Sequence, residues 1–487
     1  MNILNQQMED HKELEITFKK FSELSNNNND TFRFDAEHYQ YKYIKIIEKI
    51  NQHNNEPLIS LIKKPVTTGH TPSMKIDRFY NGEIPFIKTD NVRENSIVES
   101  FTDFLSQEGS DELISSNLET NDILLTIIGA NFSVVGRSAI VRKENLPANI
   151  NQNVALIQPD ESKISSDYLN IYLNTVYGKG CLHFHSRQTE QVNLNCREVE
   201  YVLIPRFSEL ENIVHNLSET AYGLTVKSKS LYRQAEDILN EYIGFDNEEP
   251  IFGPINIKKY SESFLLTERI DAEYYQKKYE YYLKLVTSNP NGYTFIKDEF
   301  NHINKKSDKV KTSYKYIEIG DVDIAYGTVL PNIIETVNLP DNAKTEAKMG
   351  DIIISKVRPN RGAISIIDIT DNDLIISGAF TVLRKKEESE FKNEVLQALL
   401  RTNIYRQWLL QFNIGTQYPV IRDENILNLV IPKIDSEIQL KISTLIKEAL
   451  HLKIQSESLF SSAKRAVEIA IEDGETKALT YLIEVSK

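Results

Sequence analysis

The sequence contains one module that occurs twice, and this duplication limits the folds that the chain can adopt. The pattern R-[FI]-D-A-E-x-Y-Q begins at residue 33 and again at residue 269. Three more pairs of segments match in the same order, at offsets of 230, 229 and 227: residues 86–92 with 316–322, 122–126 with 351–355, and 203–205 with 430–432. Colinear matches with a slowly drifting offset indicate an internal repeat. We therefore expect two globular halves of similar fold in tandem.

Each half is followed by a heptad pattern typical of a coiled coil. In both copies an apolar residue recurs every seven positions, and a mostly small residue follows four places later. The recurring residues are Leu210, Leu217, Leu224, Leu231 and Ile238 in the first copy and Ile438, Leu445, Leu452, Leu459 and Ala466 in the second; the residues that follow them are Val214, Ala221, Ser228, Ala235 and Tyr242, and Ile442, Ala449, Ser456, Ala463 and Ala470. Small residues at such positions let two helices approach closely.

The natural partner of each predicted helix is the other copy. The two heptad registers superpose at an offset of 228. Since the chain leaves along one helix and returns along the other after building the second half, we expect an antiparallel pair, which would place the two domains at opposite ends of a rod. A helix over residues 208–243 would be about 54 Å long. The alternative is a pair of amphipathic helices that each pack only on their own domain.

Within each half, short β-rich segments alternate with turns and are bracketed by helical stretches. The β-rich segments cover residues 122–126, 138–141, 153–158, 351–355, 363–369 and 379–383, and the helical stretches cover residues 36–52, 166–177, 272–287 and 393–411. We predict an α/β (α+β) fold with a pseudo-twofold internal repeat. The predicted boundaries are a first domain over 1–206 with a variable extension over 1–30, a helix over 207–246, a second domain over 247–434 and a helix over 435–487.

Composition excludes several classes of protein. No stretch approaches the roughly 20 apolar residues that cross a bilayer, and the first residues lack a secretory signal pattern. Together with only two cysteines, this predicts a cytoplasmic protein without a membrane or disulfide framework. The net charge of −14 argues against a generic basic nucleic-acid coat, because Lys and Arg supply most non-specific DNA affinity. Any contact with DNA must therefore rest on local positive charge.

Polar loops in both halves carry the residue types that read DNA. Arg, Asn and Gln recognise base edges in the major groove, while Lys, Ser, Thr and glycine amides suit phosphates. The candidate contacts are Lys63, Lys64, Thr68, Gly69, His70, Thr71, Ser73, Asn131, Asn151, Gln152, His185, Arg187, Gln188 and Gln191 in the first half, and Lys305, Lys306, Lys356, Arg358, Asn360, Arg361, Thr416, Gln417 and Tyr418 in the second. For each of them the alternative is a solvated loop or a side chain that satisfies its own turn.

The sequence offers little support for catalysis or for a bound metal. A P-loop, a G-x-G-x-x-G after a strand, H-E-x-x-H, G-x-S-x-G and the Asn/Asp-Pro-Pro-Tyr/Phe tetrapeptide of amino-methyltransferases are all absent. Cys181, His183 and His185, with Cys196 further on, would share one face of a strand and could hold zinc. However, the usual zinc spacings are missing, so buried cysteines and DNA-facing histidines are the preferred reading, with no metal and no cofactor bound by this chain.

The motifs together resemble the specificity (S) subunits of Type I restriction-modification systems. The matching segments are the two R-[FI]-D-A-E-x-Y-Q starts, residues 69–73 (GHTPS) followed by 84–87 (IPFI), residues 150–155 (INQNVA) and residues 355–360 (SKVRPN). The resemblance runs from about residue 32 to the end. It implies a non-catalytic subunit that binds a bipartite site on double-stranded DNA, with two target-recognition domains that each read one half-site and two conserved helices that set the gap.

The resemblance also implies partners. Two modification subunits would supply S-adenosylmethionine and adenine methylation, and restriction (motor-nuclease) subunits would supply ATP- and Mg-dependent cleavage. These partners would wrap the DNA, so the chain itself need not be basic. The loops differ between the halves, which predicts an asymmetric target. The alternatives are the recognition subunit of a Type IIB-like enzyme, a coiled-coil scaffold that binds proteins, and an unrecognised enzyme.

Overall fold

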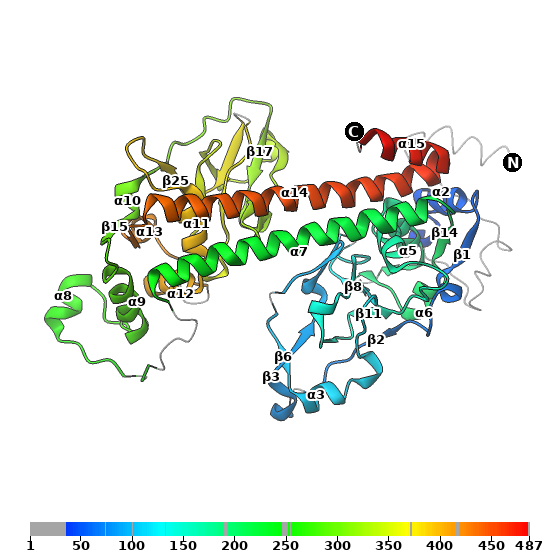
Figure 1. Ribbon diagram of the computed structural model, residues 1–487, viewed down its shortest axis with the longest axis horizontal. Coiled ribbons are helices and arrows are strands. Elements are labelled where there is room, and N and C mark those ends of the chain that lie inside the picture. The colour runs from blue at the N-terminus through cyan, green and yellow to red at the C-terminus, as the bar shows by residue number, and fades with distance from the viewer. Residues whose placement is uncertain are drawn as a thin grey trace. The chain divides into compact units, whose positions relative to one another are not determined.

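The computed structural model describes residues 36–485, except 74, 100, 132, 189–191, 246–251, 254, 371–372 and 415–417. The predicted N-terminal extension over 1–30 lies outside the described residues. Helices and strands are mixed along the chain, as predicted (Figure 1). The chain divides into two compact units, one of Met1–Leu224 with Ile454–Lys487 and one of Thr225–Lys453. Among the described helices, none is long and apolar enough to span a bilayer.

The first unit contains a four-stranded antiparallel sheet with the order β2-β11-β7-β9. Its strands are β2 (Thr67–Thr68), β11 (Val154–Ile157), β7 (Ile123–Thr126) and β9 (Ser138–Ile140). Every residue of β7 and β11 is buried, which explains why these segments are almost continuously apolar in the sequence. In a second sheet, β3 (Tyr80–Ile87) pairs in parallel with β10 (Asn149–Ile150) and antiparallel with β6 (Phe104–Leu105).

The second unit repeats the four-stranded antiparallel sheet and the parallel strand pair of the other sheet. Its antiparallel sheet has the order β16-β25-β22-β23, formed by β16 (Phe300–His302), β25 (Phe380–Lys385), β22 (Ile352–Ser355) and β23 (Ile364–Ile366). In the other sheet β17 (Ser313–Ile317) pairs in parallel with β24 (Leu374–Ser377). The edge strand β20 (Asn332–Glu335) pairs with β17, and the edge strand β21 (Ala343–Glu346) pairs with β24. The parallel registers Ile87 with Ile150 and Ile317 with Ile376 occupy equivalent places.

The hairpins and the closing strand pairs also correspond between the two units. A hairpin of β4 (Val92–Arg93) and β5 (Ser96–Ile97) corresponds to one of β18 (Val322–Asp323) and β19 (Thr328–Val329). The closing pair β1 (Asn55–Pro57) and β14 (Leu203–Pro205) corresponds to β15 (Tyr293–Phe295) and β26 (Val430–Pro432). The helices are α2 (Tyr41–Ile50), α3 (Gln107–Asp111), α4 (Ser166–Leu173), α5 (Val176–His185) and α6 (Cys196–Glu200) in the first unit, and α8 (Phe264–Thr267), α9 (Lys277–Thr287), α10 (Ile296–Glu299), α11 (Asn393–Arg401), α12 (Asn403–Leu409) and α13 (Asp423–Leu427) in the second.

Several predicted helical stretches are divided or shortened in the structure. The stretch over 166–177 breaks between α4 and α5, because the Thr175 hydroxyl accepts a hydrogen bond from the backbone N–H of Gly178 and starts a new helix. A Cβ on Gly178 would lie 2.1 Å from the carbonyl oxygen of Tyr172, so this tight break needs glycine. The stretch over 393–411 likewise divides into α11 and α12, and α9 begins only at Lys277.

Two long helices follow the two halves, α7 (Leu210–Ile243) and α14 (Ser436–Asp473). The second predicted helix, over 435–487, is not continuous. Gly474 has φ +99° and separates α14 from α15 (Glu475–Val485). The Glu475 carboxylate then accepts the backbone N–H groups of Glu209 and Leu210 at 2.8 and 2.9 Å. It thereby satisfies donors that the first turn of α7 leaves unpaired.

In each unit a part of α7 packs against a part of α14 in antiparallel fashion. In the first unit Ala221 meets Ser456 while the earlier Leu210 meets the later Glu475. In the second unit Ser228 meets Ala449, and Tyr242 meets Lys433. The running directions of the two helices are therefore opposite within both units.

Along the middle of α7 the small residues, and not the leucines, lie at the centre of this packing. Ala221, Ser228 and Ala235 are fully buried, whereas Leu217, Leu224 and Leu231 are only half-buried. The core of the first unit takes up the end of α14, through Ala463, Ala466, Val467, Ala470 and Ile471. The core of the second unit takes up the end of α7, through Tyr232, Ala235, Leu239 and Ile243. Each unit therefore builds its core from parts of both long helices.

Candidate nucleic-acid interface

Two polar loops that are distant in sequence lie side by side in each unit. In the first unit β8 (Ile128–Gly129) pairs with β13 (Val192–Asn193), which pairs with β12 (Arg187–Gln188). In the second unit a β-bridge joins Val357 to Val420. The two connections are equivalent, because Gly129 and Val357, like Val192 and Val420, are 228 positions apart. The loop that contains Asn131 is thus brought to Arg187, and the loop that contains Arg358 is brought to Tyr418.

Three of the candidate cations are neutralised by acidic side chains. The Arg187 guanidinium pairs with Glu198 at 3.0 Å. The Lys305 ammonium pairs with Glu346 at 2.6 Å. Lys356 pairs with Asp423 at 3.1 Å, and only 19% of the Lys356 side chain is exposed. Each of these positive charges would have to leave its carboxylate before it met a phosphate.

Lys356 has the most clearly structural role of the three. Asp423 also accepts a 2.6 Å hydrogen bond from the Thr381 hydroxyl on β25. Burial alone would raise the pKa of Asp423, but the hydrogen bonds from Thr381 and Lys356 lower it on balance. The ion pair therefore gives Lys356 an internal role, because it ties the loop after β22 to the start of α13. Contact of Lys356 with DNA stays a prediction.

Arg358, Asn360 and Arg361 occupy the loop that Lys356 anchors. Arg358 stacks on the ring of Tyr418, with 4.2 Å between the guanidinium carbon and the ring centre. Arg361 is exposed at the end of the 3-10 helix η11 (Pro359–Arg361). Among the described residues no carboxylate forms an ion pair with either arginine. The Oδ1 atom of Asn360 is buried without a hydrogen-bond partner. This loop offers two available guanidinium groups.

The loop over residues 69–73 contains both structural and exposed candidates. Gly69 is buried, and a Cβ there would lie 1.7 Å from the carbonyl oxygen of Ile150, so close packing explains this glycine. Asn151 is 7% exposed, and its Oδ1 accepts the N–H of Asn153. Both residues therefore contribute to packing within the unit, and their contact with DNA stays a prediction. Thr71 donates a hydrogen bond to Gln152, which joins the two candidate loops.

Most of the remaining candidate contacts lie at the surface of their units. Thr68 is half-buried in β2. The exposed residues are Lys63, Lys64, His70, Thr71, Ser73, Asn131, Gln152, Lys306 and Tyr418. The Oδ1 atom of Asn131 accepts hydrogen bonds from the backbone N–H and the hydroxyl of Ser133. Gln188 lies in β12. Gln191, Thr416 and Gln417 lie outside the described residues.

The predicted strand over 181–185 is wrong, because these residues form the end of α5. Cys181 is fully buried, and burial raises the pKa of its thiol to about 12, which disfavours the thiolate that binds metal. His183 lies with Nε2 3.2 Å from the carbonyl oxygen of Val135, and burial lowers its pKa to about 4. His185 is 8% exposed, and its contact with DNA stays a prediction. No cluster of three metal-ligating side chains occurs in the described part of the chain.

Sequence reasoning missed a pair of buried polar networks that hold the two hairpins. In the first unit Asn170 of α4 and Asn174, which follows the end of α4, both donate to the Oδ1 of Asn95, at 2.8 and 3.3 Å. At the positions 227 residues later, Gln397 donates to the carbonyl of Gly327, and Arg401 to that of Ile324, both at 2.6 Å. The sequence did contain a signal for these networks, because polar residues occur at matched positions of the two largely apolar segments that form α4 and α11.

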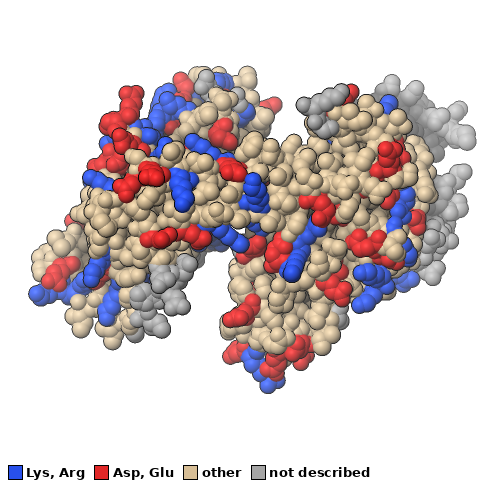
Figure 2. All heavy atoms as spheres, in the orientation of Figure 1, with Lys and Arg blue, Asp and Glu red and all other residues tan. Residues whose placement is uncertain are grey.

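Two arginines near the first hairpin were also missed. Arg93 is exposed at the end of β4, and Arg137 donates from Nε to the Ser133 carbonyl at 2.7 Å. Burial and the positive charge of Arg93 both lower the pKa of Arg137. The Asn131 loop is thus flanked by two guanidinium groups. Over the face in Figure 2, basic and acidic side chains are interspersed, so positive charge is local.

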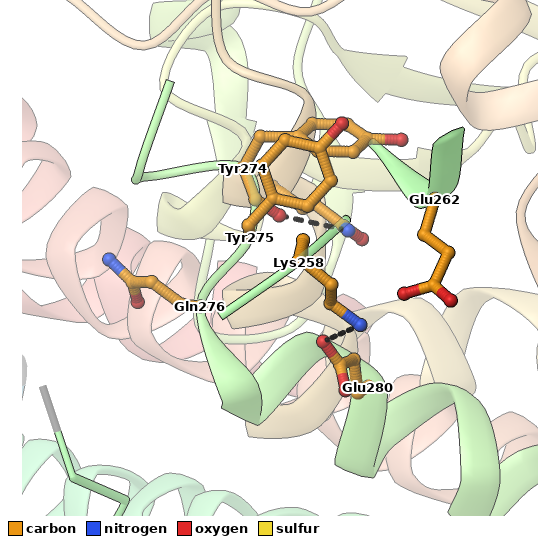
Figure 3. A pocket seen from close by; sticks show the side chains of 7 residues that line it. Lys258, Glu262, Tyr274, Tyr275, Gln276 and Glu280 are labelled. Carbon is orange, nitrogen blue, oxygen red and sulfur yellow. Dashed lines mark hydrogen bonds and ion pairs between the residues drawn. The ribbon is translucent and has the colours of Figure 1, made fainter. Parts of the chain in front are cut away.

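A small cavity in the second unit is lined by residues of the repeated motif (Figure 3). Its volume is about 150 Å³, below the roughly 300 Å³ at which pockets for small organic ligands begin. The Lys258 ammonium points across it to Glu280 at 2.7 Å, and Gln411 donates to the carbonyl of Tyr274. These contacts show a packing role for the motif and no ligand site.

No family model matches the chain, and no curated protein does. A Type I restriction-modification S subunit from M. genitalium is similar at 13% identity, with 86% of this chain and 96% of that chain covered and a TM-score of 0.39. The HsdS subunit from Thermoanaerobacter tengcongensis is similar at 12% identity, with coverage of 87% and 96% and a TM-score of 0.28.

A chain of a type I R-M system, studied for complex assembly and conformational transition, is similar at 15% identity, with coverage of 87% and 97% and a TM-score of 0.29. These three solved structures come from Type I restriction-modification systems.

Proposed function

We propose that the chain is the DNA-binding specificity subunit of a Type I restriction-modification enzyme and reads a bipartite, asymmetric site. One observation carries the proposal. Two units with equivalent four-stranded antiparallel sheets present the same pair of loops at an offset of 228, but these loops bear different polar side chains. A repeated frame with divergent loops is what recognition of two different half-sites requires.

The loop chemistry suits base recognition. Arginine binds guanine and asparagine or glutamine binds adenine through paired hydrogen bonds in the major groove. The first unit offers Asn131, Arg93 and Arg137, and the second offers Arg358 and Arg361. Since the two sets differ, each half-site would have its own sequence.

The long helices would set the gap between the half-sites and dock the modification subunits. Their antiparallel packing within each unit, with small residues at the centre, supports a coiled-coil spacer. Each domain is also fixed to the helix that follows it. Asp167 on α4 binds Arg142, His215 and Ser218, and at the matched position Glu394 on α11 binds Ser443 and Lys447. Domains fixed in this way can transmit a defined spacing.

The chemistry would belong to the partner subunits. S-adenosylmethionine would be bound by two modification subunits, and ATP and Mg by the restriction subunits, while this chain performs no catalysis. The net charge of −14 fits this division, because partners that surround the duplex would supply most phosphate contacts.

The test is a map of N6-methyladenine across the genome of the source cells, with and without the gene for this chain. We expect a two-part motif with an unmethylated gap that disappears on deletion. An unchanged methylation map, together with no sequence-dependent retention of duplex by the purified chain, would contradict the proposal and favour a protein-binding scaffold.

A further inference from the structure

Arg358 has a backbone conformation that few residues of its type adopt. Its φ of 49° and ψ of 54° lie in the left-handed region, which is sparsely populated outside glycine, asparagine and aspartate. Such conformations persist only where the surroundings enforce them, and they are concentrated at functional sites.

Several contacts enforce this conformation. The N–H of Arg358 donates to the carbonyl of Pro419 at 2.7 Å, and the N–H of Ile421 donates to the carbonyl of Lys356 at 3.0 Å. Pro359, which follows Arg358, is buried, and Gly362 closes the turn with φ +77°. The loop is therefore fixed on both sides of the arginine.

The side chain is oriented as well. The guanidinium lies over the Tyr418 ring at 4.2 Å, and Tyr418 itself is 52% exposed. No carboxylate among the described residues forms an ion pair with Arg358. A stacked guanidinium keeps its planar edge of N–H donors available, and little conformational entropy remains to be lost on binding.

A fixed planar fork of donors favours a paired acceptor. The O6 and N7 atoms of guanine form such a pair in the major groove, and arginine is their commonest partner. A phosphate could also accept from arginine, but it carries no sequence information. A fixed orientation of the guanidinium plane would add little affinity to a phosphate contact, but it would add much specificity to the recognition of a base edge.

The matched position in the first unit lacks this group. Since Gly129 corresponds to Val357, the equivalent of Arg358 is Ala130. A contact made by Arg358 would therefore belong to one half-site only. We propose that Arg358, oriented by Tyr418, recognises a guanine in the half-site that the second unit reads, an inference that rests on the proposed function.

The experiment replaces the chromosomal gene with variants and maps N6-methyladenine in each strain. Arg358→Lys keeps the charge but loses the planar fork. We expect the preference for G·C at one position of one half-site to fall by roughly 5- to 150-fold, with the other half-site and the gap unchanged. Tyr418→Phe should preserve the preference, and Tyr418→Ala should weaken it. Arg422→Lys, which changes an exposed arginine before α13 that is not among the candidate contacts, is the matched control and should leave the motif unchanged.

The outcomes separate the two proposals. If the wild-type strain has no motif that depends on this chain, the proposed function fails. If the wild-type motif exists and Arg358→Lys leaves every position unchanged, only the role of Arg358 fails. A uniform loss of methylation at all sites, with a normal melting transition of the purified variant, would identify Arg358 as a phosphate contact and would also overturn the inference.

Discussion

The hydroxyl of Ser456 on α14 donates a 2.7 Å hydrogen bond to the carbonyl oxygen of Ala221 on α7. The same bond occurs at 2.6 Å between Ser228 on α7 and Ala449 on α14, where both residues are shifted by the repeat offset of 228. A hydroxyl can reach a carbonyl of the facing helix only when the two backbones are close. The small side chains at these positions permit that approach.

Enlarging Ala221 should therefore disturb the packing of the helices. Ala221 is fully buried, so Ala221→Leu would force the helices apart and cost about 1–3 kcal/mol in the free energy of unfolding. Urea denaturation followed by circular dichroism measures the change. Val226→Leu, at a position 44% exposed on the same helix, should have little effect. Equal stability of the two variants would contradict the central position of Ala221.

Asp122 should give the first unit a stability that depends on pH. Burial raises the pKa of Asp122 to about 6, and its side-chain partner Gln158 is neutral. Because its pKa in the folded protein exceeds that in the unfolded chain, the folded state binds more protons between about pH 4 and 6. This contribution to stability is greatest below pH 4 and falls by about 3 kcal/mol as the pH rises above 6. Urea denaturation across this range measures it.

The second unit provides the control for Asp122. The equivalent Asp351 binds Arg384 through two 2.7 Å hydrogen bonds, and Arg384 occupies the place of Gln158. Asp122→Asn should remove the decline in stability, and Gln158→Arg should reduce it by lowering the pKa of Asp122. A decline that persists in Asp122→Asn would mean that another group causes it.

Asp167 should be essential for the attachment of α4 to α7. Its side chain is 6% exposed, pairs with Arg142 at 2.7 Å and accepts from Ser218 at 2.8 Å. Asp167→Ala would leave Arg142 partly unpaired in a buried place, at a cost of about 3–5 kcal/mol. Glu219→Gln, which changes the exposed partner of the same arginine, should cost under about 1 kcal/mol. Thermal melting of the two variants measures the difference in stability. Similar losses of stability in both variants would show that Asp167 stabilises the protein no more than an exposed charge does.

The spacer hypothesis predicts that longer helices lengthen the gap in the target. Between the two units the chain passes through α7 at Leu224 and through α14 at Lys453. One extra heptad after Leu224 and one after Leu452 would add about 10 Å of helix. Both half-sites should stay the same while the gap in the methylation motif grows. Insertion into one helix alone should abolish methylation, because the small residues of α7 and α14 would no longer lie opposite each other. An unchanged gap in the double insertion would refute the spacer hypothesis.

The sequence by itself determined the repeat, the mixed fold and the two long helices, because each depends on a local pattern. The run over 122–126 predicted β7 and the run over 351–355 predicted β22, since both are apolar and bounded by turns. The heptads predicted α7 and most of α14 for the same reason. Where the pattern was ambiguous, as at residues 181–185, a strand was predicted and a helix formed.

Only the tertiary structure decided which candidate side chains are available. Lys356 and Arg358 are two positions apart and equally basic, yet one is paired with Asp423 and the other stacks on Tyr418. The sequence suggested that Gly69 belongs to a phosphate-binding turn, whereas the structure packs Gly69 against the backbone of Ile150. The partners of these three residues lie between about 60 and 80 positions away in the chain. The conformation of each of these side chains is stabilised by contacts with a distant segment of the chain. Local sequence patterns do not encode such contacts.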